Sequence, residues 1–416
     1  MSNYIKPTQL YCYAAYERSL FRYTLYSIIL GLIYPVVNDG GFLTNLISLG
    51  CTIFAIAAIW VYLKNASVGQ LSSPVRFFIF VLLYMLVVGC IGGSLSVGKT
   101  TLLLTITQDL RFTSLFLLGG IYSTNERYMD YFHYFMRIIA MFAVVMGVIS
   151  IILIAKDGNL IARGGEDHTS YHYWWASTTC FAYCGLCAFF TRENRKINLT
   201  AFMAYFLIGI SFLKRSCFIN VIIIVILSCL LMTKQGKGGK MIRSLLSVLL
   251  ILFIIILFIP DVNNIIFNAL FSRFSETAND MEEFDRLLEW EAFKSNSTTL
   301  QQLIGYGIGN YPTFNRYGTF NAEDSLLNSL HLGYANIIFK GGILYAAFYV
   351  LTYLKIFRNW FACKHYSTRY LVCFGVSISS LISLLYEGSW TYTILPFCIS
   401  APIFYVATHT GNSESY

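Results

Sequence analysis

The chain has 416 residues and a formal net charge of +8, with 56% of its residues hydrophobic and only 12% charged. Soluble domains carry about twice that density of charge, so the composition excludes an ordinary soluble enzyme. It predicts an all-α, polytopic helical membrane protein with one integral membrane domain over residues 1–416.

Twelve membrane spans are predicted from apolar segments that approach the length of a bilayer crossing. Their approximate ranges are Leu20–Val37, Phe42–Leu63, Arg76–Val97, Thr101–Ser123, Tyr131–Ala155, His172–Phe190, Ile197–Leu213, Cys217–Thr233, Ser244–Pro260, Tyr334–Ile356, Tyr370–Tyr386 and Trp390–Thr408. The fourth span is unusual, because it would hold Gln108, Asp109 and Arg111 inside the bilayer.

The distribution of Lys and Arg predicts that the N-terminus lies in the cytoplasm. With that orientation eighteen of these residues face the cytoplasm: Lys6, Arg18, Arg22, Lys64, Arg76, Arg127, Arg137, Arg192, Arg195, Lys196, Lys234, Lys237, Lys240, Arg243, Lys355, Arg358, Lys364 and Arg369. Five lie in short outer loops: Lys99, Lys156, Arg163, Lys214 and Arg215. The positive charge is therefore a signal of orientation and gives no reason to expect a nucleic-acid partner.

The segment Gly93–Thr100 matches the phosphate-binding loop pattern G-x-x-x-x-G-K-[ST]. That loop binds nucleotides only where a strand precedes it and a helix follows it. Here a membrane span precedes it, and the orientation places Lys99 outside, where no nucleoside triphosphate is supplied. We interpret the segment as a turn between two helices.

Cys180, Cys184 and Cys187 share one face of a predicted helix, and His168 and His172 precede them. A metal site is one interpretation of this spacing. Packing of small side chains within a span is favoured, because free cysteine behaves as a small hydrophobe. No metal or other cofactor is predicted.

Arg215 lies at the outer face, in a short turn between the seventh and eighth spans. A guanidinium that snorkels to the interface is the ordinary interpretation. However, Lys214 and Arg215 depart from the positive-inside bias. The loop that holds them is short, so a long translocated loop does not explain the departure. This makes Arg215 a candidate for a functional role.

A long polar segment, residues 260–333, follows the ninth span and is predicted to face outward. An amphipathic helix over the outer membrane face is predicted from the spacing of Leu287, Trp290, Phe293, Leu300 and Leu303. Arg286 lies in the same stretch. It either pairs with neighbouring acidic residues or grips a diphosphate with its planar fork of donors.

The polar segment continues through Gly305, Gly307 and Gly309, which permit a tight turn and close approach of the backbone to a ligand. His331 follows, and Tyr334 comes just after it. An imidazole is a natural general base for a sugar hydroxyl at neutral pH. Aromatic rings with polar edges, such as Tyr334, suit the faces and rims of sugars.

Together these residues resemble the O-antigen polymerase and O-antigen ligase superfamily of bacterial inner-membrane glycosyltransferases. The match covers three places in the sequence. They are Arg215 after an outward-going span, the Arg286-x-x-x-Trp290 block with the Gly305–Gly309 turn after it, and the block from His331 through Tyr334 to Lys340-Gly341-Gly342.

The resemblance implies a GT-C-like fold of about twelve transmembrane helices, with the active site in the periplasmic loop 260–333. It implies residence in the bacterial inner (cytoplasmic) membrane and a role in polysaccharide or lipopolysaccharide biosynthesis. The expected reaction transfers a glycan from an undecaprenyl-diphosphate carrier to a glycan acceptor on the periplasmic face. The implied partners are the undecaprenyl-diphosphate-linked oligosaccharide, membrane lipids and a chain-length regulator protein.

By the same likeness, Arg215 and Arg286 bind the diphosphate of the carrier, and Trp290 and Tyr334 contact the substrate. His331 is the general base of a metal-independent transfer. The resemblance favours a polymerase over a ligase that transfers glycan to lipid A-core, because ligases tend to have Asn directly after the His. This chain has Leu332 there.

Two other classes of protein fit about twelve spans. A flippase or transporter of lipid-linked glycans would show internal repeats and charged or broken helices near the midplane. Asp109 and Arg111 favour that class, whereas the one-sided loop and the lack of a repeat favour an enzyme. An accessory subunit of an envelope complex is the third interpretation.

The orientation is directly testable by labelling single cysteines with a membrane-impermeant reagent, in a protein that lacks its native cysteines. We expect Asn279→Cys to be labelled from outside intact cells and Lys237→Cys to remain unlabelled. The opposite pattern would reverse the whole topology.

Overall fold

The structure is a computed structural model. It describes residues 15–34, 42–66, 68–91, 99–156, 178–191, 194–211, 215–234, 290–291, 293–295, 297–309, 333–363, 366–384 and 394–409. Every regular element within these ranges is helical.

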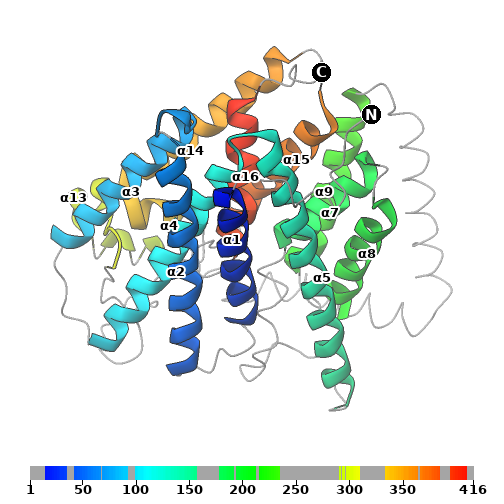
Figure 1. Ribbon diagram of the computed structural model, residues 1–416, viewed down its shortest axis with the longest axis horizontal. Coiled ribbons are helices and arrows are strands. Elements are labelled where there is room, and N and C mark those ends of the chain that lie inside the picture. The colour runs from blue at the N-terminus through cyan, green and yellow to red at the C-terminus, as the bar shows by residue number, and fades with distance from the viewer. Residues whose placement is uncertain are drawn as a thin grey trace.

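The helices follow the predicted spans closely (Figure 1). They are α1 (Ala15–Ile33), α2 (Phe42–Asn65), α3 (Ser73–Ile91), α4 (Lys99–Tyr122), α5 (Glu126–Lys156), α7 (Thr178–Phe190), α8 (Arg195–Ser211), α9 (Arg215–Lys234), α14 (Gly333–Ala362), α15 (Thr368–Ser383) and α16 (Leu395–Thr408). A 3-10 turn, η3 (Val68–Gln70), and a short helix, α13 (Thr299–Ile304), complete the set. The predicted ninth span, Ser244–Pro260, lies outside the described residues.

Four of these helices are long and apolar enough to cross a membrane. They are Phe42–Asn65, Ser73–Cys90, Glu126–Ile149 and Gly333–Ala362. Four further helices are apolar but shorter. The chain is thus helical with membrane-capable segments, and the count of twelve spans stays a prediction.

The segment that matches a phosphate-binding loop has the wrong surroundings for one. α3 precedes it, and α4 begins at Lys99. Gly93–Gly98 lies outside the described residues. Because a helix stands where the nucleotide-binding motif requires a strand, the interpretation as a turn between helices is favoured.

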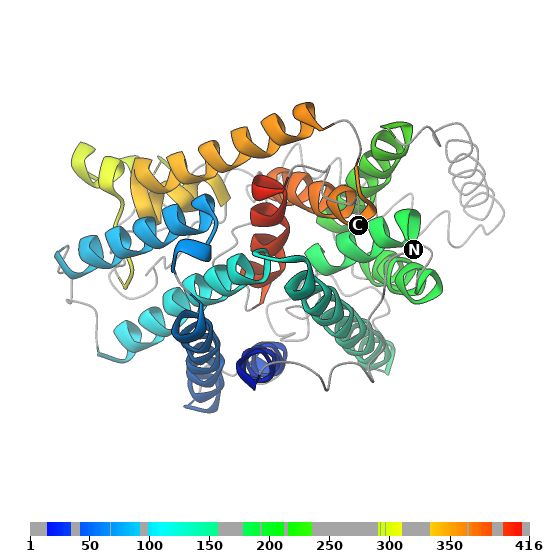
Figure 2. The same cartoon turned by 45° about the horizontal axis from the view of Figure 1, so that its top comes forward.

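α16 forms the centre of the bundle (Figure 2). Every residue from Leu395 to Ala407 is buried, as expected for a helix that is apolar on all sides. α16 packs against α3, α4, α5, α7, α14 and α15. Gly119 of α4 permits a close approach to α16, because a Cβ there would lie 2.0 Å from Ser400 Oγ.

The three clustered cysteines of α7 pack inside the bundle, as predicted. Cys180, Cys184 and Cys187 are all buried. Cys180 Sγ lies 3.4 Å from Cys398 Sγ of α16. His168 and His172 lie outside the described residues.

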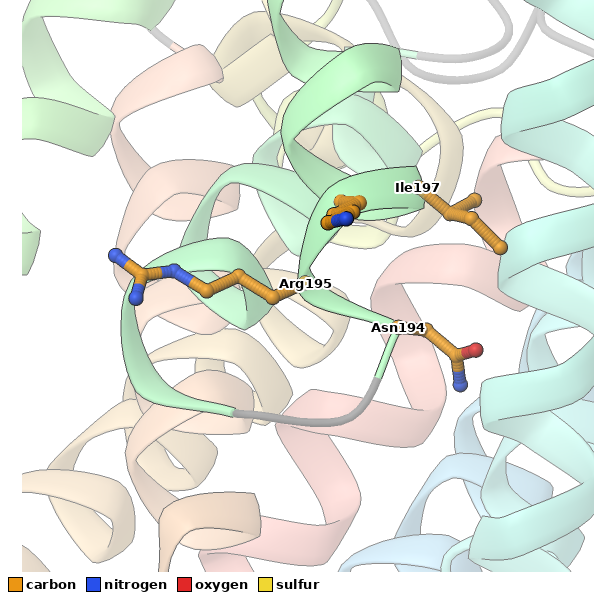
Figure 3. Close-up of a pocket in the computed structure, with 4 residues that line it drawn as sticks. Asn194, Arg195 and Ile197 are labelled. Carbon is orange, nitrogen blue, oxygen red and sulfur yellow. The ribbon is translucent and has the colours of Figure 1, made fainter.

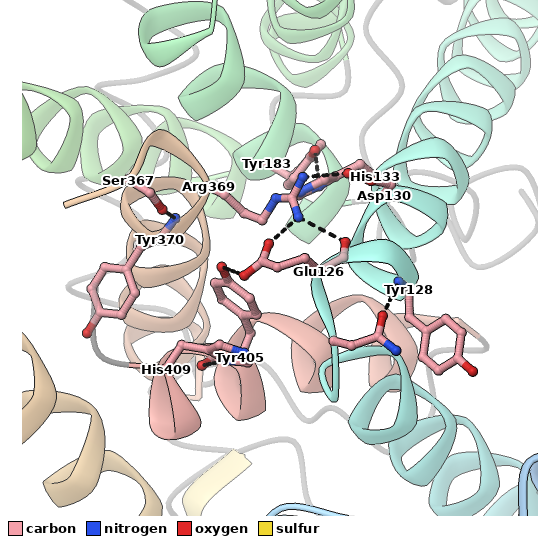
Figure 4. A network of polar contacts seen from close by, with 11 residues as sticks. Glu126, Tyr128, Asp130, His133, Tyr183, Ser367, Arg369, Tyr370, Tyr405 and His409 are labelled. Carbon is pink, nitrogen blue, oxygen red and sulfur yellow. Dashed lines mark hydrogen bonds and ion pairs between the residues drawn. The ribbon is translucent and has the colours of Figure 1, made fainter. Parts of the chain in front are cut away.

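A polar network joins α5, α15 and α16 near the start of α5 (Figure 4). Arg369 of α15 forms ion pairs with Glu126 and Asp130 of α5. Tyr405 Oη of α16 donates to Glu126 Oε1 at 2.6 Å. These bonds hold α5, α15 and α16 together at this end of the bundle.

α14 is broken at Gly342, where φ is 57° and ψ is −152°. Residues 333–341 are called the first arm below. Tyr334 Oη, at the start of the first arm, donates to Leu381 O of α15 at 2.9 Å. Tyr353 Oη, beyond the break, donates to Ser377 O of α15 at 3.0 Å.

These two bonds show that the break is a sharp bend. In a straight helix, Tyr334 and Tyr353 would stand about 28 Å apart along the axis. Their acceptors lie about one helical turn apart on α15, or roughly 6 Å. The first arm therefore folds back toward the rest of α14.

Candidate functional site

The structure describes the side chains of two of the five predicted site residues, Trp290 and Tyr334. Arg215 is the first residue of α9, but its side chain is outside the described part. Arg286 and His331 lie outside the described residues altogether. α9 packs against α15, the helix that accepts the Tyr334 hydrogen bond.

Trp290 belongs to a small aromatic cluster on the first arm. Its ring centroid is 5.3 Å from that of Phe293. Phe293 is fully buried, with ring centroids 5.7 Å from Phe339 and 6.1 Å from Tyr306. Through this cluster Trp290 and Phe293, which follow Arg286 in sequence, pack on the first arm of α14.

The predicted continuous amphipathic helix through Leu303 is wrong. Thr298 is extended, with φ −68° and ψ 157°, and it caps a new helix, α13. Its Oγ1 accepts from Gln301 N at 3.2 Å, and Gln301 Oε1 accepts from Thr298 N at 2.9 Å. This reciprocal capping box starts α13 afresh. Phe293 faces α14, while Leu303 is exposed.

Residues 305–309, called the glycine strap below, run from α13 into the bundle between α3, α4 and α14. Four consecutive amides of the strap donate to acceptors outside it. The bonds are Tyr306 N to Phe339 O (2.8 Å), Gly307 N to Lys340 O (2.9 Å), Ile308 N to Met85 O (3.0 Å) and Gly309 N to Asp109 Oδ2 (2.9 Å). Tyr84 Oη also donates to Ile304 O, just before the strap, at 2.8 Å.

The break in α14 explains two of these bonds. A helix that is interrupted leaves carbonyls of the preceding turn without their usual partners. Phe339 O and Lys340 O lie in that turn, directly before Gly342. The strap supplies amides to both carbonyls, so the interruption does not leave them unsatisfied.

Glycine is required at the closest approaches. Gly305, Gly307 and Gly309 have φ of 77°, 75° and 82°, a region that other residues occupy with strain. A Cβ on Gly307 would lie 2.3 Å from the backbone N of Gly89. Such overlap between backbones cannot be relieved by moving a side chain.

An ion pair anchors the far end of the strap. Lys340 Nζ lies 3.0 Å from Asp109 Oδ2, the oxygen that also accepts from Gly309. Lys340 is 0% exposed and Asp109 is 3% exposed. An opposite charge is the usual way in which an ionised side chain is held inside a membrane protein.

Sequence reasoning noticed both residues but missed their pairing. In the sequence, Asp109 stands out as a charge within an apolar span that favours a transporter, and Lys340 belongs to the block that begins at His331. The signal that could have linked them is the presence of opposite charges in two separate apolar spans. Their 231-residue separation leaves no local pattern that would single out this pair.

Arg111 turns to the other side of α4. Its Nη1 donates to Ser48 Oγ of α2 at 2.8 Å, and its guanidinium lies 4.3 Å from the centroid of the Tyr34 ring. Cation–π contact stabilises a buried guanidinium. The two charged residues of α4 thus fasten it to different neighbours, Asp109 to α14 and Arg111 to α2.

A pocket of about 670 Å³ opens elsewhere, at the start of α8 (Figure 3). Asn194, Arg195, Lys196 and Ile197 line it. The predicted orientation places this loop in the cytoplasm, away from the long polar segment. Its exposed basic residues fit the charge bias expected of a cytoplasmic loop, and the described residues that line it include none of the five predicted site residues.

Within the described part of the chain, no three His, Cys, Asp or Glu residues are grouped to hold a metal ion. Comparisons with protein-family models, with curated proteins and with solved structures find no match. The candidate site is therefore defined by its own geometry. It consists of the first arm, the aromatic cluster on it and the glycine strap.

The strap predicts an intolerance to a single methyl group. Gly307→Ala should lower the thermal unfolding midpoint of the purified protein clearly, because strain of about 1–2 kcal/mol at positive φ adds to the overlap with Gly89. Gly50→Ala in α2 is the matched control. A Cβ there meets only the Leu30 side chain, at 3.0 Å. Equal unfolding midpoints for the two variants would show that the strap is not tightly packed.

Proposed function

We propose that this protein is a polysaccharide polymerase of GT-C-like type in a bacterial inner membrane. It transfers an undecaprenyl-diphosphate-linked glycan to a glycan acceptor on the periplasmic face. The observation that carries the proposal is the position of the first arm of α14. Tyr334 links this arm to α15, and the aromatic cluster of Trp290 packs on it.

Two of the remaining proposed site residues, Arg286 and His331, are close in sequence to the same unit. His331 precedes Gly333, the first residue of the arm, by two positions, and Arg286 precedes Trp290 by four. Arg215 opens α9, which shares α15 as a neighbour with Tyr334. A fold that brings segments next to these residues to the first arm and to α15 is suited to an active site built from distant parts of the sequence.

In the proposed reaction, the acceptor hydroxyl attacks the anomeric carbon of the carrier-linked sugar. The bond between that carbon and the diphosphate oxygen breaks, and the configuration inverts. His331 takes the hydroxyl proton as the new bond forms. Arg215 and Arg286 neutralise the departing diphosphate, for which guanidinium groups are well suited. This scheme requires no metal.

The aromatic residues would hold the sugars. Tyr334 is 40% exposed, so its ring is accessible even though its hydroxyl is bonded to α15. Trp290 is partly buried on Phe293. Stacking on the apolar face of a pyranose is the contact that such rings offer. A chain-length regulator is the protein partner expected for such a polymerase.

A lipid-linked glycan flippase is the second candidate, and one observation favours it. α14 is a broken helix with a charged pair beside the break, a feature of transporters. In transporters, however, the freed backbone groups face a substrate or ion. Here Phe339 O and Lys340 O accept from the strap, and Asp109 is bonded to Lys340 and Gly309. These groups are therefore already occupied.

His331 should be essential for transfer. We expect His331→Ala to insert and fold normally and to bind the lipid-linked donor. It should lose roughly 10²–10⁴-fold in rate, the usual contribution of a general base. The measurement is ladder formation by purified protein in lipid, with a synthetic lipid-diphosphate repeat unit and no nucleotide or metal. Normal ladders would remove the base from the mechanism. Transfer to lipid A-core in place of glycan would identify a ligase.

Arg286 should act on the donor. Each hydrogen bond to a charged group contributes about 1.5–3 kcal/mol, so Arg286→Ala should reduce turnover tenfold or more. Arg286→Lys should recover only part of it, since ammonium lacks the bidentate fork. Lys294→Ala, an exposed cation of the same segment, is the control and should be neutral. Full activity of Arg286→Gln would mean that Arg286 merely pairs with nearby acids.

A further inference from the structure

We infer that Asp109 is a positioning residue, which fixes the glycine strap by accepting the Gly309 amide, and that Lys340 is the counterion that permits a carboxylate there. The role assigned to the strap rests on the proposed function. The strap lies between the Trp290 segment and the segment that leads to His331, so its position sets where the first ends and where the second begins.

The strap needs a side-chain acceptor at its end. Tyr306, Gly307 and Ile308 donate to backbone carbonyls of α14 and α3. Gly309 instead meets α4, where a regular helix uses its own carbonyls internally. A carboxylate provides the missing acceptor, and hydrogen bonds to an ionised acceptor are roughly twice as strong as neutral ones.

Lys340 contacts both the strap and Asp109, the residue that anchors it. Its carbonyl accepts from Gly307 N at 2.9 Å, and its Nζ reaches Asp109 Oδ2 at 3.0 Å. The strap thus lies between the first arm of α14 and α4, with one residue of the arm in contact with both the strap and its anchor. A shift of either element would move the strap.

The effect of the Asp109–Lys340 ion pair and the effect of the oxygen that accepts from Gly309 can be separated experimentally. Removing one member of a buried ion pair leaves an uncompensated charge, whereas replacing both with neutral residues of similar size is often tolerated. Single variants at Asp109 or Lys340 would therefore measure mainly the cost of leaving one buried charge unpaired. Two double variants avoid this problem, because both are neutral and both lack the ion pair.

The first is Asp109→Asn with Lys340→Met, which keeps a side-chain oxygen for the Gly309 amide. The second is Asp109→Leu with Lys340→Met, which has a side chain of similar size but no acceptor. The pair differs only in the bond proposed to position the strap. Hydrogen–deuterium exchange of the peptide that covers residues 305–309, thermal unfolding and polymer formation would be measured for both and for the parent protein.

We expect the Asn variant to resemble the parent protein in exchange and to keep most of its turnover. The Leu variant should unfold at a similar temperature to the Asn variant but exchange its strap amides about tenfold faster or more. Its turnover should fall about tenfold or more, because small misplacements of reacting groups reduce rates steeply.

Equal strap exchange in the two variants would overturn the inference, whether both match the parent protein or both exchange faster. In the first case the acceptor is dispensable, and in the second the ion pair itself holds the strap. Faster exchange without any loss of turnover would also overturn the positioning role. If the parent protein forms no polymer, the proposed function fails, while the exchange measurement still decides how the strap is held.

Discussion

The need to satisfy backbone hydrogen bonds inside an apolar bundle governs the arrangement around α14. Lipid offers no partners for peptide groups, so non-helical backbone is tolerated at membrane depth only where protein supplies the partners. The glycine strap meets this requirement with four donors and four acceptors on α14, α3 and α4. The break at Gly342 and the strap are therefore mutually dependent, because each supplies groups that the other leaves unpaired.

Glycine makes that dependence geometrically possible. A Cβ on Gly342 would lie 2.1 Å from Leu303 O, and a Cβ on Gly89 would lie 2.1 Å from Ile308 O. At each contact, the backbone of a glycine thus meets a backbone carbonyl of the other segment, with no Cβ between them. Peptide groups approach closely enough to bond across α3 and α14, and the side chains of Tyr306 and Ile308 add packing to these backbone bonds. The same closeness makes the contact sensitive to single substitutions.

The sequence indicated the helices well because span length and apolar periodicity are local properties. The helices that coincide with predicted spans follow from that signal alone.

The strap could not be placed, because Gly309 and Asp109 are 200 residues apart and nothing local links them. The helix predicted through Leu303 was wrong for a local reason, the capping box of Thr298 and Gln301, which hydrophobic spacing does not register. Trp290 and Tyr334 were predicted as site residues from short motifs, and that role stays a prediction. In the structure Trp290 packs on the first arm, and Tyr334 is part of that arm and is bonded to α15.

Charged residues in apolar spans are commonly a sign of transport, and Asp109 and Arg111 favoured that interpretation in the sequence. Their contacts change what they imply. Asp109 is bonded to Lys340 and the strap, and Arg111 to Ser48 and the Tyr34 ring.

A transporter must move such groups between two arrangements to carry a substrate across. Freeing Asp109 would separate a buried ion pair and unpair the Gly309 amide together, which opposes repeated motion at this position. An enzyme has the opposite requirement, since it gains from holding the segments around a reaction in one place. The buried pair therefore favours a fixed scaffold for the glycine strap over a moving gate.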